Sequence, residues 1–254
     1  MARKSSKTSK KSKSTSKAKK KNEKGGLIGT PARFVRRAWN LTFRALLLVV
    51  VLGLAVTVAF SFINPPTTPY MFSESRRLGG VNQTWVAMDD IAPAMARSAV
   101  AAEDSNYCNH WGLDLTAIQA ALDAGGSRGA STISQQVVKN VFLWHGRSWF
   151  RKSLEALMTP VVEAVWSKER ILEVYLNVAE FDEGVFGVEA AAVHYFGVHA
   201  DELTQTQAAR LAAILPNPKG RSASQPSRFV RSRAASIIDG AATIAADGRA
   251  ACFQ

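Results

Sequence analysis

A group of ionisable residues near the middle of the chain is the first candidate for chemistry. Glu103 and Asp104 are followed by His110 and Asp114 within a stretch of 12 residues. The apolar residues of 95–102 predict a helix face that runs into Glu103, where partial burial would raise the pKa of the carboxyl group. Such a group suits a general base. Spacing alone leaves open the alternative of a surface Glu that caps a turn.

A second cluster, residues 129–140, places hydroxyl, amide and cationic side chains after a turn of small residues. The pattern predicts a helix start, whose free N–H groups and positive dipole end can bind a phosphate or a sugar. A plain N-cap at Ser131 or Thr132 is the alternative. The order of residues does not match a P-loop. The candidate ligand-binding residues are Ser131, Gln135, Gln136, Lys139 and Asn140.

A third cluster is rich in cations. Arg151 and Lys152 precede Glu155 by four and three residues, so the three side chains share one face of a predicted helix. An exposed pair of this kind contributes only about 0.2–0.5 kcal/mol and indicates little alone. Lys139 and Arg147, together with Arg151 and Lys152, fall within 14 residues that contain no acid. This density of cations suits a diphosphate.

Five segments resemble, in order, the five motifs of the peptidoglycan glycosyltransferases of family 51. They are residues 103–114, 129–140, 151–155, 168–177 and 210–218, and the resemblance covers about residues 85–233. It implies an all-α fold, a lysozyme-like helical glycosyltransferase domain. With one apolar N-terminal segment and no second large domain, the chain is similar to the monofunctional members, which lack a transpeptidase domain.

The resemblance also implies the reaction: lipid II is polymerised into β-1,4-linked glycan strands, with inversion and release of undecaprenyl diphosphate. Glu103 would be the general base on the acceptor 4-hydroxyl, and Asp104 would orient the loop. Glu155 would stabilise the donor diphosphate or a divalent cation there, Mg²⁺ or Mn²⁺, although no set of protein metal ligands is predicted. The residues implied to line the donor site are Ser131, Gln135, Gln136, Lys139, Asn140, Arg147, Arg151 and Lys152.

Two other functions remain open at this stage. A lytic muramidase with one prominent Glu would cleave the same bond, but it has little use for a cradle of cations because its leaving group is uncharged. A non-catalytic membrane-anchored cell-wall scaffold has no reason to keep both Glu103 and Glu155 together with the neighbouring residues of their motifs. The transferase is therefore the leading hypothesis.

Helical periodicity must supply the framework for these clusters. Apolar stripes typical of amphipathic helices recur within residues 113–122, 150–165 and 171–175, and no comparable β-type alternation is present. In the resembled family a small lobe faces the membrane. Trp144, Trp149 and Phe150 are candidates for that lipid-facing surface, with packed core aromatics as the alternative.

Charge is distributed unevenly along the 254 residues. The formal charge is +12, yet residues 1–44 contain 15 of the 32 basic residues and a single acid, Glu23. Residues 45–63 contain no charge and are long enough to cross a membrane as a helix. We expect a disordered basic cytoplasmic tail (1–40), a transmembrane helix (41–63), a periplasmic linker (64–84) and the catalytic domain (85–254). The basic flank predicts an inner-membrane protein with a cytoplasmic N-terminus.

The tail and the cysteines restrict the partners. The tail has no aromatic residue before Phe34, so we expect contact with an anionic membrane surface and no binding of nucleic acid. Proteins of the cell-wall synthesis machinery are further expected partners. Cys108 and Cys252 allow at most one disulfide, and the sequence leaves open whether they form it.

Overall fold

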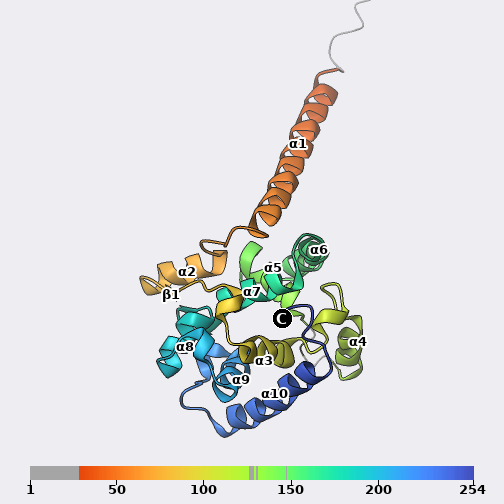
Figure 1. Cartoon of the computed structure of the whole chain (residues 1–254). Helices are drawn as coiled ribbons and strands as arrows, with labels where there is room; N and C mark the ends of the chain where they lie inside the picture. Colours follow the sequence, from red (N-terminus) through yellow and green to blue (C-terminus); the bar gives the residue numbers. More distant parts are fainter. Residues whose placement is uncertain (1–28, 126–128, 130, 147) are drawn as a thin grey trace, which may run out of the picture. The chain divides into compact units, whose positions relative to one another are not determined.

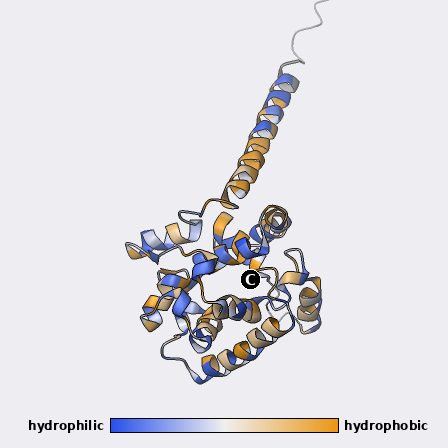
Figure 2. Ribbon diagram, in the orientation of Figure 1, coloured by the Kyte–Doolittle hydropathy of each residue, from blue (hydrophilic) through white to orange (hydrophobic). Residues whose placement is uncertain are grey.

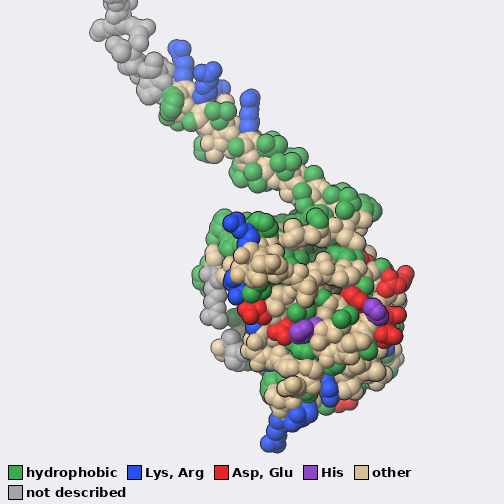
Figure 3. Space-filling model, turned by 90° about the vertical axis from the view of Figure 1, so that its left-hand side faces the viewer, with side chains coloured by type: hydrophobic (Ala, Val, Ile, Leu, Met, Phe, Trp, Pro, Cys, Tyr) green, Lys and Arg blue, Asp and Glu red, His purple; other side chains and the backbone are tan. Residues whose placement is uncertain are grey.

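The computed structural model describes residues 29–125, 129, 131–146 and 148–254, and it divides into a unit that ends at Leu52 and a unit that begins at Gly53. Helix α1 (Gly29–Phe60) is the main element of the first unit and ends in the second. Its large side chains from Leu46 to Leu52 are 50–65% exposed. Residues 33–60 are long and apolar enough to cross a membrane, as expected for the anchor. In Figure 2 the start of α1 has many hydrophilic residues and the rest of the helix is mostly hydrophobic, and Figure 3 shows Lys and Arg side chains near that start.

The second unit is mainly helical, which confirms the expected all-α fold class. Its short 3₁₀ turns include Met88–Asp90, Tyr107–Asn109, Ala200–Glu202 and Pro218–Gly220. Its helices, labelled in Figure 1, are α2 (Pro69–Leu78), α3 (Pro93–Glu103), α4 (Leu115–Asp123), α5 (Ile133–Phe142), α6 (Trp149–Val165), α7 (Lys168–Val178), α8 (Val188–Phe196), α9 (Gln205–Ile214) and α10 (Arg228–Ala246).

Two groups of helices build the core of this unit. Helices α3, α9 and α10 pack against one another, and α5 packs against α6 and α7. Met95 of α3, Leu211 of α9 and Leu176 of α7 are fully buried among other apolar side chains. These helices therefore form a rigid base for the loop that follows α3, which carries the first motif.

A small sheet, which the sequence does not indicate, joins α7 to α8. Strands β1 (Asn82–Gln83), β3 (Val185–Phe186) and β2 (Glu180–Asp182) lie in that order, with β1 parallel and β2 antiparallel to β3. Thus part of the expected linker, residues 69–83, forms helix α2 and strand β1. Gly187 after β3 has φ +83°, and a Cβ atom there would lie 2.9 Å from the carbonyl oxygen of Asn177.

Helix α6 turns its polar side inward. The apolar stripe expected from the sequence is present, but Phe150 and Leu157 are 67% and 71% exposed. The buried positions are instead occupied by Glu155, Thr159 and Glu163, with Val162. Charged groups of this helix therefore lie in the interior, where they must find partners.

The last turn of α1 is fastened within the second unit. The indole N–H of Trp166 donates to the carbonyl oxygen of Thr57 at 2.8 Å. The guanidinium of Arg170 donates to the carbonyl oxygens of Phe60 and Ile63. These bonds satisfy carbonyl groups that a helix end leaves without intrahelical partners.

Candidate active site

The carboxylate of Glu103 stands at the C-terminal end of α3. The side-chain amide of Gln136, on α5, donates to its Oε2 at 2.9 Å. Burial raises the pKa of Glu103 above its ordinary value, and it outweighs the opposing effects of the Gln136 hydrogen bond and of the positive charges of Arg233 and Lys139. The expectation of a partly buried carboxyl group at a helix end is confirmed.

Asp104 anchors the loop that follows Glu103. Its Oδ2 accepts from the backbone N–H of Ile133 at 3.0 Å, at the start of α5, where the helix dipole favours a negative charge. Its Oδ1 lies 2.8 Å from Nε2 of His110, while Nδ1 of His110 accepts from the N–H of Gly112. His110 therefore carries its proton on Nε2 and donates it to Asp104. The proposed orienting role of Asp104 agrees with this geometry.

The start of α5 is bonded within the protein. Thr132 is the N-cap, and it exchanges hydrogen bonds with Gln135 in a capping box. The side-chain oxygen of Gln135 thus accepts from the backbone of Thr132, and with Ile133 bound to Asp104 this helix start is not a free anion site. The structure therefore shows the N-cap alternative, at Thr132. The capping box also occupies Gln135, a residue that the resemblance implies to line the donor site.

A second buried network fixes the same loop against α6. The carboxylate of Glu163 accepts from Oγ of Ser134 at 2.5 Å and from Nζ of Lys168 at 2.8 Å. Lys168 also donates to the carbonyl oxygen of His110. Gly112 has φ +80°, and a Cβ atom there would lie 2.4 Å from a methyl carbon of Thr159 on α6. Only a glycine allows the loop to lie this close to the helix.

Glu155 forms the centre of the cation cluster. The residue is 3% exposed, accepts from Arg151 at 2.7 Å and is paired with Lys152. Lys152 also donates to Oγ of Ser131 at 3.2 Å. The structure therefore brings these four predicted residues together, whereas Arg147 lies outside the described residues.

Lys139 links the two carboxylates electrostatically. Burial lowers the pKa of its ammonium group, while the negative charges of Glu155 and Glu103 oppose that shift. No other described residue hydrogen-bonds to the Lys139 side chain, so its ammonium group is available to a ligand. Its neighbour on α5, Asn140, is paired with His145 at 3.2 Å.

These α5 residues line a cleft of about 360 Å³. Its other walls come from α2, α7 and the fifth motif, and they contain residues that the sequence did not single out. The ring of Tyr70 stacks on His145 with centroids 3.5 Å apart, and its hydroxyl donates to Glu180 at 2.6 Å. Lys219 pairs with Glu74 at 2.8 Å. The cleft is lined by Tyr70, Gln136, Lys139, Asn140, His145, Tyr175, Ala179, Glu180, Leu215, Pro216, Asn217, Pro218 and Lys219.

Two groups of side chains contain atoms of the kind that bind metal ions. Asp104, His110 and Asp114 offer atoms within 4.8 Å of one another, but those atoms bond to each other and to nearby N–H and hydroxyl groups. Glu155 already binds two cations, so a divalent ion would have to displace one of them. Neither donor set fits a resident ion.

The comparisons with known proteins agree with this geometry. The sequence model of a family described as "Transglycosylase" matches residues 72–242, which contain Glu103, Glu155 and the cleft walls from α5 to the fifth motif. The chain belongs to the transglycosylase family. A biosynthetic peptidoglycan transglycosylase of Jannaschia sp. (strain CCS1) is 63% identical over 196 residues, covering 77% of this chain and 82% of the relative. Proteins of the same name from Caulobacter vibrioides and Rhodospirillum centenum are 47% and 44% identical, covering 87% and 88% of this chain and 98% and 96% of the relatives.

Within this transglycosylase, the residues implied by the resemblance separate into three groups. Gln136, Lys139 and Asn140 line the cleft, and Glu103 joins them through Gln136. Ser131, Arg151, Lys152 and Glu155 form the cation cluster. Asp104 and Gln135 are bonded to the backbone at the start of α5. The sequence analysis named His110 without its role as the partner of Asp104, and it named Thr132 as a possible N-cap, whereas Tyr70 and Arg233 carry no local signal.

Proposed function

We propose that this transglycosylase polymerises lipid II into β-1,4-linked glycan strands and releases undecaprenyl diphosphate. The observation that carries the proposal is a half-buried general-base candidate, Glu103, whose partner Gln136 lines a cleft together with the cations Lys139 and Lys219. A displacement at an anomeric carbon needs a base for the acceptor and stabilisation of charge on the leaving group. Relatives named for peptidoglycan transglycosylation support the substrate class.

In the proposed reaction, Glu103 accepts the proton of the acceptor 4-hydroxyl. The oxygen forms a bond to the donor anomeric carbon, and the bond between that carbon and the diphosphate oxygen breaks, with inversion from α to β. The hydrogen bond from Gln136 orients the Glu103 carboxylate for this transfer. The raised pKa makes Glu103 a stronger base than an exposed glutamate.

The leaving diphosphate would be received by Lys139, Arg151 and Lys152. Burial of Lys139 strengthens its interaction with an anion because little water competes there. Glu155 holds Arg151 and Lys152 in place by charge-assisted hydrogen bonds. We assign Ser131 and Asn140 to the donor side, where they adjoin these cations.

A divalent cation at the diphosphate stays a prediction. The cations above provide positive charge without one, and Glu155 is occupied by its partners. Chelation with EDTA tests the point: unchanged strand synthesis would remove the ion from the proposal, and loss restored by Mg²⁺ or Mn²⁺ would retain it.

We further propose that α1 anchors the protein in the inner membrane, with the N-terminus in the cytoplasm and the catalytic unit in the periplasm. The apolar helix with basic residues at its start supports this orientation. Trp149 and Phe150 are 89% and 67% exposed, and Trp144 is 45% exposed. Exposed aromatics of this kind suit the membrane interface, where the lipid-linked substrate resides. Contacts with other cell-wall synthesis proteins stay a prediction.

The decisive experiment is polymerisation of lipid II by the detergent-purified full chain, with products resolved by length. Glu103→Gln is compared with the wild type and with Glu169→Gln, a matched change at an exposed position. We expect long strands from the wild type and the control, and none from Glu103→Gln. Cleavage of preformed glycan without synthesis would replace the proposal by a lytic enzyme. The absence of both synthesis and cleavage would favour a non-catalytic scaffold.

A further inference from the structure

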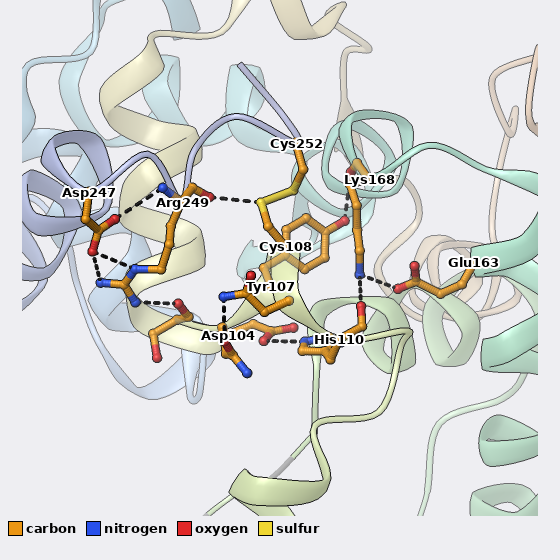
Figure 4. The surroundings of a disulfide bond; sticks show 12 residues. Asp104, Tyr107, Cys108, His110, Glu163, Lys168, Asp247, Arg249 and Cys252 are labelled. Atoms are coloured by element: carbon orange, nitrogen blue, oxygen red, sulfur yellow. Dashed lines mark hydrogen bonds and ion pairs between the residues drawn. A yellow bond between two sulfur atoms is a disulfide. The ribbon is translucent and has the colours of Figure 1, made fainter.

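The last eight residues of the chain turn back onto the first motif. Helix α10 ends at Ala246, and residues 247–254, here called the C-terminal strap, run beside α3 and the loop that follows it (Figures 1 and 4). A disulfide joins Cys252 of the strap to Cys108 of the loop, which are 144 positions apart in the sequence, with Cα atoms 5.7 Å apart. The structure thus answers the question that the two cysteines left open.

Polar contacts add to the covalent bond. The guanidinium of Arg249 donates to the carbonyl oxygen of Ser105 at 2.9 Å, two residues after Glu103. Asp247 holds that guanidinium through an Nε hydrogen bond of 2.8 Å (Figure 4). The strap is therefore bonded to the loop at two places, at Ser105 next to the general base and at Cys108.

An apolar contact carries the connection further. Phe253 is 2% exposed and packs on Tyr107, with ring centroids 6.1 Å apart. The hydroxyl of Tyr107 donates to the carbonyl oxygen of Lys168 at 2.7 Å, and Lys168 donates to the carbonyl oxygen of His110. His110 in turn holds Asp104. The strap thus supports the network that fixes the loop to α5 and α6.

The strap also reaches the other end of α3. The side-chain amide of Gln254 donates to the carbonyl oxygen of Pro93 at 3.0 Å and accepts from Arg97 at 2.8 Å. Both residues lie in the first turns of α3, whose last residue is Glu103. One short segment therefore holds the beginning of this helix and the loop after its end.

The loop needs such support. Helix α3 ends without a glycine cap, at Asp104, and the backbone continues through turns and one short 3₁₀ segment before α4 begins. The Glu103 carboxylate is half-buried against a neutral amide, Gln136. The charged and titratable groups that face it are Asp104, Lys139 of α5, Arg233 of α10 and Tyr175 of α7. Keeping a carboxylate partly dehydrated costs free energy, so a loosened loop would turn it toward water.

We propose that the C-terminal strap, closed by the Cys108–Cys252 disulfide, is a positioning element that holds the general base Glu103 in its catalytic, water-shielded orientation. This inference rests on the proposed function of Glu103. A disulfide that only stabilised the fold would be expected to leave the chemistry of the folded enzyme unchanged. A positioning disulfide changes kcat, and it changes the pH at which the base becomes active.

The test uses the full-length protein isolated with its disulfide from an oxidising compartment. Wild type is compared with Cys252→Ser, with Cys108→Ser/Cys252→Ser and with Ala251→Ser, an exposed strap position that serves as control. The wild type is also treated with dithiothreitol, which donates two electrons and two protons to give two thiols and becomes a cyclic disulfide itself. Circular dichroism identifies a temperature at which all forms are folded, and kcat, KM and the pH profile for lipid II polymerisation are measured there.

We expect kcat to fall about 10- to 100-fold in the reduced wild type and in both serine variants, with KM changed less than twofold. The acidic limb of the profile should move to lower pH, because a hydrated Glu103 has a lower pKa. Dithiothreitol should not affect the variants, the double variant should equal the single one, and Ala251→Ser should match the wild type. Arg249→Ala should reproduce part of the shift with the disulfide intact.

Two results would overturn the inference. One is an unchanged kcat and acidic limb in the reduced wild type, even with a lower melting temperature, since that defines a purely structural bond. The other is two free thiols per chain in the active protein from the native compartment. Failure of the proposed function is distinct, because then the oxidised wild type itself would make no strands.

Discussion

Replacing Asp104 by Asn removes one charge and almost no volume, so it isolates the electrostatic part of the loop's anchorage. The carboxylate accepts two hydrogen bonds, from the N–H of Ile133 and from Nε2 of His110. An Asn side chain has one oxygen, and its NH₂ group must face the second donor. His110 cannot simply shift its proton to Nδ1, because Nδ1 accepts from Gly112. The NH₂ group of the Asn is therefore left facing either the N–H of Ile133 or the Nε2–H of His110, and that pair cannot form a hydrogen bond.

The size of the effect follows from these contacts. Losing one buried hydrogen bond to a charged group costs about 1.5–3 kcal/mol. Losing the negative charge at the start of α5 adds about 0.3–1 kcal/mol. We expect a total near 2–4 kcal/mol, which lowers the melting temperature of a domain of this size by roughly 4–16 °C. The negative charge of Asp104 also raises the pKa of Glu103, so the acidic limb of kcat/KM should move to lower pH.

Thermal melts followed by near-ultraviolet circular dichroism in detergent measure the first effect, and polymerisation rates between pH 4 and pH 8 measure the second. Asp90→Asn is the matched control, because Asp90 is exposed. A melting temperature within about 1 °C of the wild type for Asp104→Asn would refute the two-donor reasoning. So would an acidic limb that moves upward.

Three further predictions concern neighbouring residues. Gln136→Leu removes a hydrogen-bond donor that lowers the pKa of Glu103, so the acidic limb of kcat/KM should move to higher pH, opposite to Asp104→Asn. An acidic limb that does not move would show that Gln136 does not influence the titration of the base. Glu155→Gln removes the negative charge that Arg151 and Lys152 share, and in thermal melts it should lower the free energy of unfolding by about 2–4 kcal/mol. The loss is smaller than for a fully buried ion pair because Lys152 reaches water, and strand synthesis should fall at least tenfold. Gly187→Ala places a Cβ atom 2.9 Å from the carbonyl oxygen of Asn177 at φ +83° and should lower stability by about 1–3 kcal/mol; a neutral melt would show that the turn relaxes freely.

Local sequence patterns predicted helical segments within α3 to α7, but they did not show which way the helix faces point. Gln135 illustrates the limit at the site: its position in the second motif suggested a ligand-binding amide, but three residues after Thr132 it completes a capping box. The Thr-x-x-Gln spacing was a readable signal for that role. Arg233 and Tyr70 had no such signal, because their partners Ala102 and Glu180 are 131 and 110 residues away in the sequence. Contacts of this range follow only from the assembled fold.

Helix α6 shows the same limit, with a consequence for function. Periodicity identifies its apolar stripe, and burial of apolar area would normally turn that stripe inward. The structure does the reverse for Phe150 and Leu157, because the inward positions are taken by Glu155 and Glu163. Glu155 is satisfied by Arg151 and Lys152 of the same helix. Glu163 is satisfied by Lys168 and by the hydroxyl of Ser134 from neighbouring segments.

This arrangement gives one helix two tasks. Its inner face supplies the fixed charges that hold the cation cluster and the first-motif loop. Its outer face leaves large apolar side chains exposed, which a protein in water alone would tend to cover. Both features suit the proposed lipid-linked substrate, in which a diphosphate joins the sugar to the lipid. A helix that packed its apolar stripe inward would lose the lipid-compatible surface, and it would turn Glu155 and its two cations away from Ser131 at the same time.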